Sequence, residues 1–341
     1  MLKTPSGAPH RYLSIVSVVA LLALGGIAPA ASLEKITFQL NYPAAGYNAG
    51  YELAVEKGFY RDAGLDVSIE PGNGSQITAQ LVAAGKADIA FADASPVMKL
   101  ISQGAKMRVL ATILQGNPNQ VTALKKTGLK SVADMRGRSV AVPNGGSQVA
   151  MFPLVLAANG LKETDIKVVN MPPDSMVPAL LQGTVDVILG SVDAYGPQLK
   201  SMNVETDNFM FIDSGAPTVS TSIIASDAFL AAHPDQAKAF VAASLKGWYA
   251  ALDDQPAAIA AMKKIFPDAN DKLAPGQIDA TKFLMCVNRA KFVGKATPEQ
   301  WSDTVKIFSA IGVLPADIPA TRYYTYDYLP PESALRSCPL T

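Results

Sequence analysis

The sequence has 341 residues, with 29 Lys and Arg residues balanced by 29 Asp and Glu residues and only two histidines. Charged residues make up 17% of the chain and hydrophobic residues 49%. This composition excludes an intrinsically disordered protein, and the balanced charge argues against a nucleic-acid-binding protein, which would carry a basic patch. The length suggests two domains, each large enough to bury a hydrophobic core.

The first thirty residues have the pattern of a secretory signal peptide. Lys3 and Arg11 precede an uncharged run from Leu13 to Leu24, and small residues follow as far as Ala31. The alternative, a transmembrane anchor, would need about 20 apolar residues. We therefore expect residues 1–30 to be cleaved off near Ala30 and the mature protein to be soluble and periplasmic. Its net charge would be −2, because 27 of the 29 basic residues remain against 29 acidic ones.

The two cysteines, Cys286 and Cys338, both lie in the mature part. An exported protein with two cysteines most simply forms one disulfide, and two unpaired buried thiols are the alternative. A metal site is disfavoured because only His233 is left as a histidine ligand and no cysteine pair has ligand spacing. We expect neither a metal nor a cofactor.

From residue 36 onward, short β-rich runs alternate with helical stretches. The first series predicts strands and helices alternating over 36–40, 49–57, 65–70, 75–84, 89–91, 96–103 and 107–114. The second series does the same over 139–142, 148–159, 166–170, 175–182 and 185–189. Helices alone are predicted after residue 226, over 228–232, 234–253, 256–266, 276–287 and 298–311. The alternation predicts an α/β fold with open, mostly parallel sheets.

The two series resemble each other. In each, a helix ends at a glycine, Gly85 or Gly183, where a left-handed backbone costs little. A strand follows, and an Asp-Ala pair stands just beyond it, at residues 93–94 and 193–194. Two copies about a hundred residues apart favour two similar α/β lobes.

Four runs carry a resemblance to a known family. They are EKGFY with GLDV at 56–67, AGKADIAF at 84–91, DMRGRSVAV at 134–142 and YTYDYL at 324–329. Together they resemble the periplasmic solute-binding proteins of ABC importers for nitrate, taurine, alkanesulfonates and the thiamine pyrimidine precursor.

The resemblance implies a type II periplasmic binding protein fold, with two doubly wound α/β lobes and a ligand cleft between them. It implies crossings between the lobes near 115–123 and 214–224. Lobe I would comprise residues 31–118 and 223–341, and lobe II residues 119–222. The implied partners are a small-molecule ligand, an ABC permease and, through it, an ATPase. We expect a monomer that binds no nucleic acid and meets the membrane only through the permease.

In open α/β sheets, ligands bind at the carboxyl ends of the strands, where helix N-termini also point. The loops expected there are 41–48, 72–76, 92–95, 115–119, 144–148, 171–175 and 190–195. The candidate ligand-binding residues are Asn41, Tyr42, Tyr47, Asn48, Gly74, Ser75, Asp93, Ser95, Gln115, Asn117, Gly146, Ser147, Gln148, Asp193 and Tyr195. The glycine-rich turns before residues 75 and 147 can offer backbone N–H groups, or simply begin their helices.

These loops contain no lysine or arginine, although they contain three aspartates and three tyrosines. A buried dianion would normally need a cation or a bidentate arginine. The loops therefore favour a neutral or weakly basic planar ligand, such as a thiamine pyrimidine precursor. Alternatively, Tyr42 and Tyr47 are core residues, Asp174 is a helix cap, and backbone N–H groups and hydroxyls hold an alkanesulfonate, taurine, nitrate or an aromatic carboxylate.

Two other functions compete with that of a carrier. The chain also resembles fungal thiamine-pyrimidine synthases, which use a histidine, a lysine and a cysteine-rich iron motif. It lacks such a cysteine cluster, and Asn48 stands near where that group places its histidine. We therefore expect no enzyme. A ligand-sensing subunit of a membrane kinase or receptor remains an alternative. The tyrosine-rich tail, residues 322–331, should pack on the first lobe rather than cover the cleft.

Overall fold

The computed structural model describes residues 32–144 and 147–340. The expected signal peptide lies outside the described residues. Within 32–144 and 147–340, no helix has the length and apolar character needed to cross a membrane. Residues 33–341 form one unit, which contains two five-stranded sheets.

The first sheet has the strand order β2-β1-β3-β10-β4. Its strands are β1 (Glu34–Gln39), β2 (Leu65–Glu70), β3 (Ile89–Ala92), β4 (Met107–Thr112) and β10 (Ser222–Ser226). β1 pairs in parallel with β2 and β3, whereas β10 is antiparallel to both β3 and β4. All four residues of β3 are buried, as is typical of a strand covered by helices on both faces. We call this sheet with its helices the first lobe.

The second sheet, with its helices the second lobe, has the order β7-β6-β8-β5-β9. Its strands are β5 (Asn119–Leu124), β6 (Ser139–Pro143), β7 (Lys167–Met171), β8 (Val187–Ser191) and β9 (Thr206–Met210). β6 is parallel to β7 and β8, and β5 is antiparallel to β8 and β9. The pattern of order and direction therefore repeats that of the first sheet.

The expectation of mostly parallel sheets was wrong, because half of the pairings in each sheet are antiparallel. The chain enters each of the antiparallel strands β5 and β10 from the other lobe, without an α-helix directly before the strand. The alternation of strands and helices in the sequence therefore did not predict them. Both lie partly within the segments expected to cross between lobes. β9 was also missed, because this edge strand, TDNFM, has no fully buried residue.

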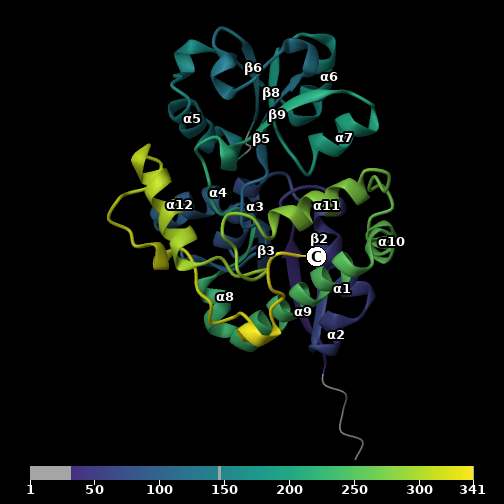
Figure 1. The fold of residues 1–341 in the computed structure, drawn as a ribbon. Coiled ribbons are helices and arrows are strands. Elements are labelled where there is room, and N and C mark those ends of the chain that lie inside the picture. The colour runs from purple at the N-terminus through teal and green to yellow at the C-terminus, as the bar shows by residue number, and fades with distance from the viewer. Residues whose placement is uncertain (1–31, 145–146, 341) are drawn as a thin grey trace, which may run out of the picture. The chain divides into compact units, whose positions relative to one another are not determined.

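The helices fall into two groups along the chain (Figure 1). Those interleaved with the strands are α1 (Ala49–Glu56), α2 (Phe59–Asp62), α3 (Ser75–Ala83), α4 (Ala94–Ser102), α5 (Gln148–Ala158), α6 (Pro173–Gln182) and α7 (Tyr195–Ser201). Those after β10 are α8 (Asp227–Ala232), α9 (Pro234–Asp253), α10 (Gln255–Ile265), α11 (Ala274–Leu284) and α12 (Pro298–Ala310). The 3-10 turns are Gly46–Asn48, Lys125–Thr127, Val132–Met135, Glu163–Asp165, Phe211–Asp213, Ala320–Arg322 and Glu332–Ala334.

Local sequence explains where several of these helices begin. α12 starts with a capping box, in which Thr297 accepts a bond from the Gln300 backbone and Gln300 accepts one from the Thr297 backbone. α9, α10, α11 and α12 all have proline in their first turn, where the missing N–H costs nothing.

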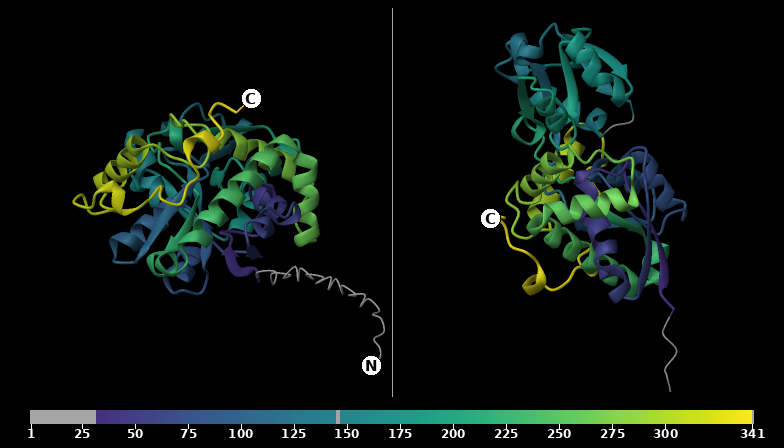
Figure 2. Two further views of the ribbon diagram at one scale, coloured as in Figure 1. Left: turned by 90° about the horizontal axis from the view of Figure 1, so that it is seen from below. Right: turned by 90° about the vertical axis from the view of Figure 1, so that its right-hand side faces the viewer.

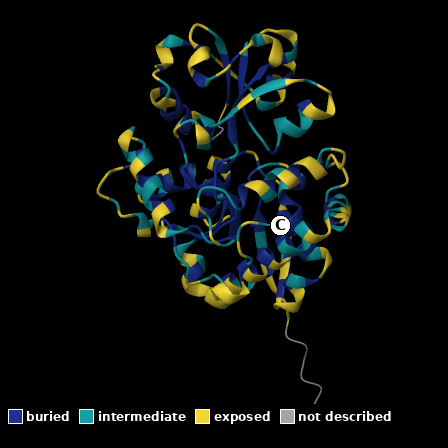
Figure 3. Cartoon of the chain, in the orientation of Figure 1, coloured by how far each residue is buried: buried dark blue, intermediate teal, exposed yellow. Residues whose placement is uncertain are grey.

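The core of the first lobe is an aromatic cluster between β1, α1 and α9. Phe38 contacts Tyr51 and Phe240 with ring centroids 4.8 and 4.9 Å away, and Tyr51 meets Trp248 edge-on. Figure 3 shows buried strands beneath exposed outer helix faces. Gly50 lets α1 approach α9 closely, since a Cβ there would lie 2.3 Å from the Trp248 ring.

The C-terminal tail packs on the first lobe, as expected (Figure 2). Tyr323 is fully buried, and Tyr324 stacks on Trp301 with ring centroids 4.9 Å apart. The Cys286–Cys338 disulfide, whose Cα atoms are 5.4 Å apart, confirms the predicted bridge and ties the tail to the segment after α11. The tail therefore forms part of the lobe's structure.

Candidate ligand-binding site

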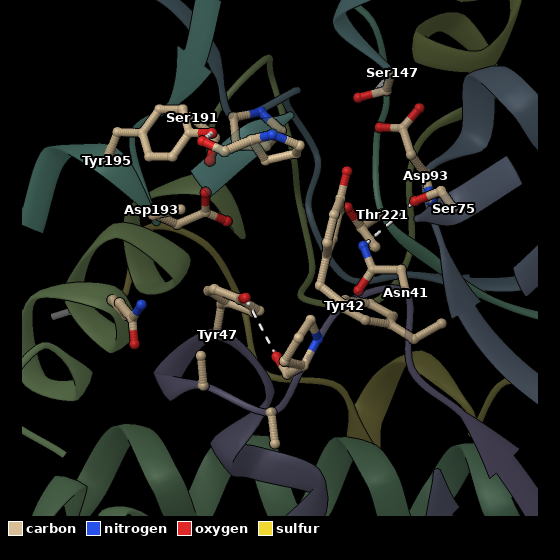
Figure 4. Close-up of a pocket in the computed structure, with 18 of the residues that line it drawn as sticks. Asn41, Tyr42, Tyr47, Ser75, Asp93, Ser147, Ser191, Asp193, Tyr195 and Thr221 are labelled. Atoms are coloured by element: carbon tan, nitrogen blue, oxygen red, sulfur yellow. Dashed lines mark hydrogen bonds between the residues drawn. The ribbon is translucent and has the colours of Figure 1, made fainter. Parts of the chain in front are cut away.

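A cavity of about 510 Å³ lies at the carboxyl ends of strands from both sheets (Figure 4). The first lobe contributes the loop after β1, with Asn41, Tyr42 and Tyr47, and the residue after β3, Asp93. The second lobe contributes the start of α5 and the turn after β8. This position is the one at which open α/β sheets hold ligands.

Nine of the fifteen candidate residues line this cavity. They are Asn41, Tyr42, Tyr47, Ser75, Asp93, Ser147, Gln148, Asp193 and Tyr195. They come from five of the seven expected loops, which the two folded sheets bring to one place.

Three of the other candidates are buried and lie off the cavity lining. Asn48 is fully buried at the end of the first 3-10 turn, and its side-chain amide has no hydrogen-bond partner among the described residues. Gln115 and Asn117 support the first crossing: the Gln115 side-chain amide donates to the Phe292 carbonyl, and that of Asn117 donates to the Ala216 carbonyl. The Gln115 and Asn117 amides therefore hold the first crossing in place and are not part of the cavity lining.

The remaining three candidates also lie off the cavity lining. Gly74 precedes α3, with a φ of 111° that favours glycine. The Ser95 hydroxyl donates to Asp93, and Ser95 lines a neighbouring cavity beside α4. Gly146 lies outside the described residues.

Other lining residues were missed. Asn119 and Thr221 lie beside the two crossings, and Phe266, Asp268 and Gln277 come from the α10–α11 region. Gln277 accepts a hydrogen bond from the Gly46 backbone at 2.8 Å, which connects α11 to the loop after β1. The strand-end rule could not identify the α10–α11 segment, because that segment follows a helix.

Asp93 is a helix cap that also faces the cavity. Its Oδ1 accepts bonds from the Ser95 backbone at 2.9 Å and the Ser95 hydroxyl at 2.7 Å, and its Oδ2 accepts one from the Ser220 hydroxyl at 2.7 Å. Burial raises the pKa of Asp93, while these bonds oppose the increase. Both oxygens are therefore engaged within the protein.

Asp193 is buried without being a cap. α7 begins at Tyr195 with Ala194 as its N-cap, so the Asp193 carboxylate is not committed to a helix end. Burial raises the pKa of Asp193, and a hydrogen bond with the Ser191 side chain opposes that increase.

Three half-buried tyrosines complete the wall. Tyr42 lies between Asp93 and Asp193 in Figure 4, and burial, followed by the charge of each carboxylate, raises the pKa of its hydroxyl. The Tyr47 hydroxyl donates to the Pro43 carbonyl and the Tyr195 hydroxyl to the Pro173 carbonyl. Burial also raises the pKa of these two hydroxyls, so all three tyrosines are neutral.

Within the described part of the chain, the cavity lining holds four aspartates but no lysine, arginine or histidine. Among the residues that the structure describes, no group of His, Cys, Asp and Glu is arranged to hold a metal ion. The cavity thus has an aspartate at the carboxyl end of each sheet, Asp93 and Asp193, and three tyrosines in the same lining.

This architecture is that of the periplasmic binding proteins. The aliphatic sulphonate binding protein SsuA of Escherichia coli superposes with a TM-score of 0.68 at 15% identity, covering 86% of this chain and 92% of that one. The nitrate-binding protein NrtA of Synechocystis PCC 6803 superposes with a TM-score of 0.62 at 18% identity, covering 87% of each chain. These likenesses establish the two-lobed α/β fold.

The family model described as "NMT1/THI5 like" matches residues 46–258, and the chain belongs to this family. The riboflavin-binding protein RibY of Chloroflexus aurantiacus is 24% identical over 308 residues, 88% of this chain and 87% of that protein. A pyrimidine phosphate synthase of Schizosaccharomyces pombe, for 4-amino-5-hydroxymethyl-2-methylpyrimidine phosphate, is 23% identical over 88% of this chain and 89% of that protein. A Haemophilus influenzae protein named for thiamine biosynthesis is 29% identical over 181 residues, and the chain spans about half of its length, 56%.

Proposed function

We propose that this protein is the exported solute-binding component of an ABC importer, and that it captures a small planar ligand of the thiamine-pyrimidine-precursor type. The observation that carries the proposal is the cavity itself. It is lined by both lobes and combines three tyrosines with buried hydrogen-bond acceptors, while no described lining residue is a lysine, arginine or histidine.

The chemistry of the lining favours a flat heterocycle over an anion. Tyr42, Tyr47 and Tyr195 offer aromatic faces and edges against which a ring can pack, an interaction worth about 0.5–1.5 kcal/mol beyond area burial. Recognition of a sulfonate, nitrate or carboxylate would instead gain most from a cation or from free N–H donors. The names of RibY and of the pyrimidine synthase add support, since both concern planar nitrogen heterocycles.

The proposed mechanism is capture by lobe closure. Residues 31–118 and 223–341 would move as one lobe and residues 119–222 as the other, about the segments near 115–123 and 214–224. A ligand that contacts both lobes binds the closed form more tightly, and this difference in affinity drives closure. The closed form would then dock on the permease.

Isothermal titration calorimetry of the exported protein tests the proposal. We expect 4-amino-5-hydroxymethyl-2-methylpyrimidine to bind with 1:1 stoichiometry, and taurine and nitrate to give no heat of binding. Tight binding of taurine or nitrate without a response to the pyrimidine would contradict the ligand class. Formation of any product from the bound pyrimidine, followed by mass spectrometry, would contradict the carrier role.

A further inference from the structure

Two amide side chains of the cavity, those of Asn41 and Gln148, use an N–H donor inside the protein. The Asn41 Nδ2 lies 3.4 Å from the Ser75 hydroxyl, and the Gln148 Nε2 lies 3.5 Å from the Gly190 carbonyl. Their carbonyl oxygens, Asn41 Oδ1 and Gln148 Oε1, are buried and have no hydrogen-bond partner among the described residues. A buried acceptor left without a donor costs about 1–3 kcal/mol. The two oxygens therefore point to a ligand that brings N–H or O–H groups.

The two buried aspartates differ in what they leave available to a ligand. Asp93 is 4% exposed and spends both oxygens on Ser95 and Ser220. Asp193 is 7% exposed, and among the described side chains only Ser191 bonds to its carboxylate. A buried carboxylate without a cation is unfavourable, and the described cavity lining supplies none.

No other titratable group around the cavity offers compensation. Asp174 and Asp268 are exposed members of the lining, and Glu52 lies behind Tyr47. The hydroxyls of Tyr42, Tyr47 and Tyr195 keep their protons, because burial raises their pKa. The only side chains of charged type in the described cavity lining are therefore acidic.

We infer that the cavity binds its ligand as a planar monocation, with Asp193 as the counter-ion and with Asn41 Oδ1 and Gln148 Oε1 as acceptors of its N–H groups. An amidinium or a protonated aminoheterocycle meets all three requirements, because it is flat, positively charged and rich in N–H donors. A carboxylate can accept two parallel N–H bonds from such a group, and these charge-assisted bonds are the strong ones. The inference rests on the proposed function only in taking this cavity as the ligand site.

Three probes of nearly equal shape test this inference. Benzamidine, benzamide and benzoate differ mainly in charge, being cationic, neutral and anionic at pH 7. We expect calorimetry to show benzamidine binding at least tenfold more tightly than benzamide, and benzoate not binding at millimolar concentration.

The matched variants are Asp193→Asn and Asp213→Asn. Both remove one negative charge, but Asp213 is an exposed residue outside the cavity lining. Asp193→Asn should weaken benzamidine binding by roughly 10- to 100-fold, the range for a lost hydrogen bond to a charged group. It should change benzamide binding by less than about threefold on the same physical argument. Asp213→Asn should change neither, and denaturation midpoints report whether each variant is folded.

Several results would overturn the inference. They are benzamide or benzoate binding as tightly as benzamidine, no binding of any of the three at millimolar concentration, or an unchanged benzamidine affinity in folded Asp193→Asn. If 4-amino-5-hydroxymethyl-2-methylpyrimidine still binds to the wild type, only the cationic state and the role of Asp193 are lost. If that pyrimidine also fails while taurine or nitrate binds, the proposed ligand class fails as well.

Discussion

Asp93 and Asp193 stand at corresponding places in the two lobes, in the turn after the third strand of each parallel trio. Asp93 is the first residue after β3, and Asp193 is the second residue after β8. In the first lobe the helix begins at the next residue, so Asp93 becomes its N-cap and is held by three hydrogen bonds. In the second lobe the helix begins one residue later, and Ala194 occupies the cap position instead. A shift of one residue in the helix start, relative to the aspartate, thus separates a carboxylate that caps a helix from one that does not.

The lobes also differ in how much chain supports them. The first lobe carries α8 to α12, the tail and the disulfide, whereas the α-helices described in the second lobe are α5, α6 and α7. The repeated sheet therefore brings an aspartate to the same edge of each lobe, and the local structure around each aspartate determines its hydrogen bonds.

A third buried carboxylate, Glu52 in the first lobe, gives the largest expected effect. It is fully buried, accepts no hydrogen bond from another described residue, and burial raises its pKa from 4.5 to about 8. The folded state therefore holds a proton that the unfolded state releases, so this contribution to stability is present at low pH and is lost as pH rises through about 8. The loss between pH 5 and pH 8 should be about 3–4 kcal/mol.

Glu52→Gln removes that titration while keeping the size of the side chain. Urea denaturation of the variant should show stability that falls less between pH 5 and pH 8 than that of the wild type. Parallel stability curves for the two proteins would show that Glu52 is ionised in the folded protein, or that its surroundings are wetter than the fold indicates.

The comparison of the two aspartates predicts the next largest effect. Asp93→Ala should lower the free energy of unfolding by about 2–3 kcal/mol, because it removes a helix cap and leaves Ser220 and the Ser95 backbone without an acceptor. Asp193→Ala should lower it by less than about 1 kcal/mol or raise it, because no cap is lost and a buried charge is removed. Urea denaturation at pH 7 measures both, and equal losses would break the proposed division of roles.

The smallest effect concerns Tyr42, which lies between the two carboxylates. Tyr42→Phe keeps the ring and removes one neutral hydroxyl, so pyrimidine affinity should fall by about fivefold at most. Tyr249→Phe is the matched control, since its hydroxyl bonds to the Arg336 backbone in the first lobe, outside the cavity lining. A larger loss in Tyr42→Phe would assign to its hydroxyl a direct bond to the ligand's charged group.

Local patterns predicted much of the fold. Helix α9 and strand β2 have the predicted bounds, because proline at a first turn and a glycine before a β-rich run are local signals. Strands β5 and β10 were missed because no α-helix directly precedes them, and β9 because none of its residues is fully buried. In the site, Asp93 and Asp193 follow from the strand-end rule, whereas Gln277 reaches the cavity through packing of α11 on the loop after β1. The one-residue difference in helix start, which separates the two aspartates, was not visible in the sequence.

The double crossing has a consequence for how the chain assembles during synthesis. Every strand of the second sheet lies between residues 119 and 210, so that sheet can close as soon as this continuous stretch is available. The first sheet is different, because β10 stands between β3 and β4 and joins them. Until residue 226 is available, the strand trio β2-β1-β3 and the lone strand β4 have no common partner. We therefore expect the second lobe to fold first, although its sequence follows that of β1 to β4. Strand β10 would then leave the folded second lobe and complete the first sheet.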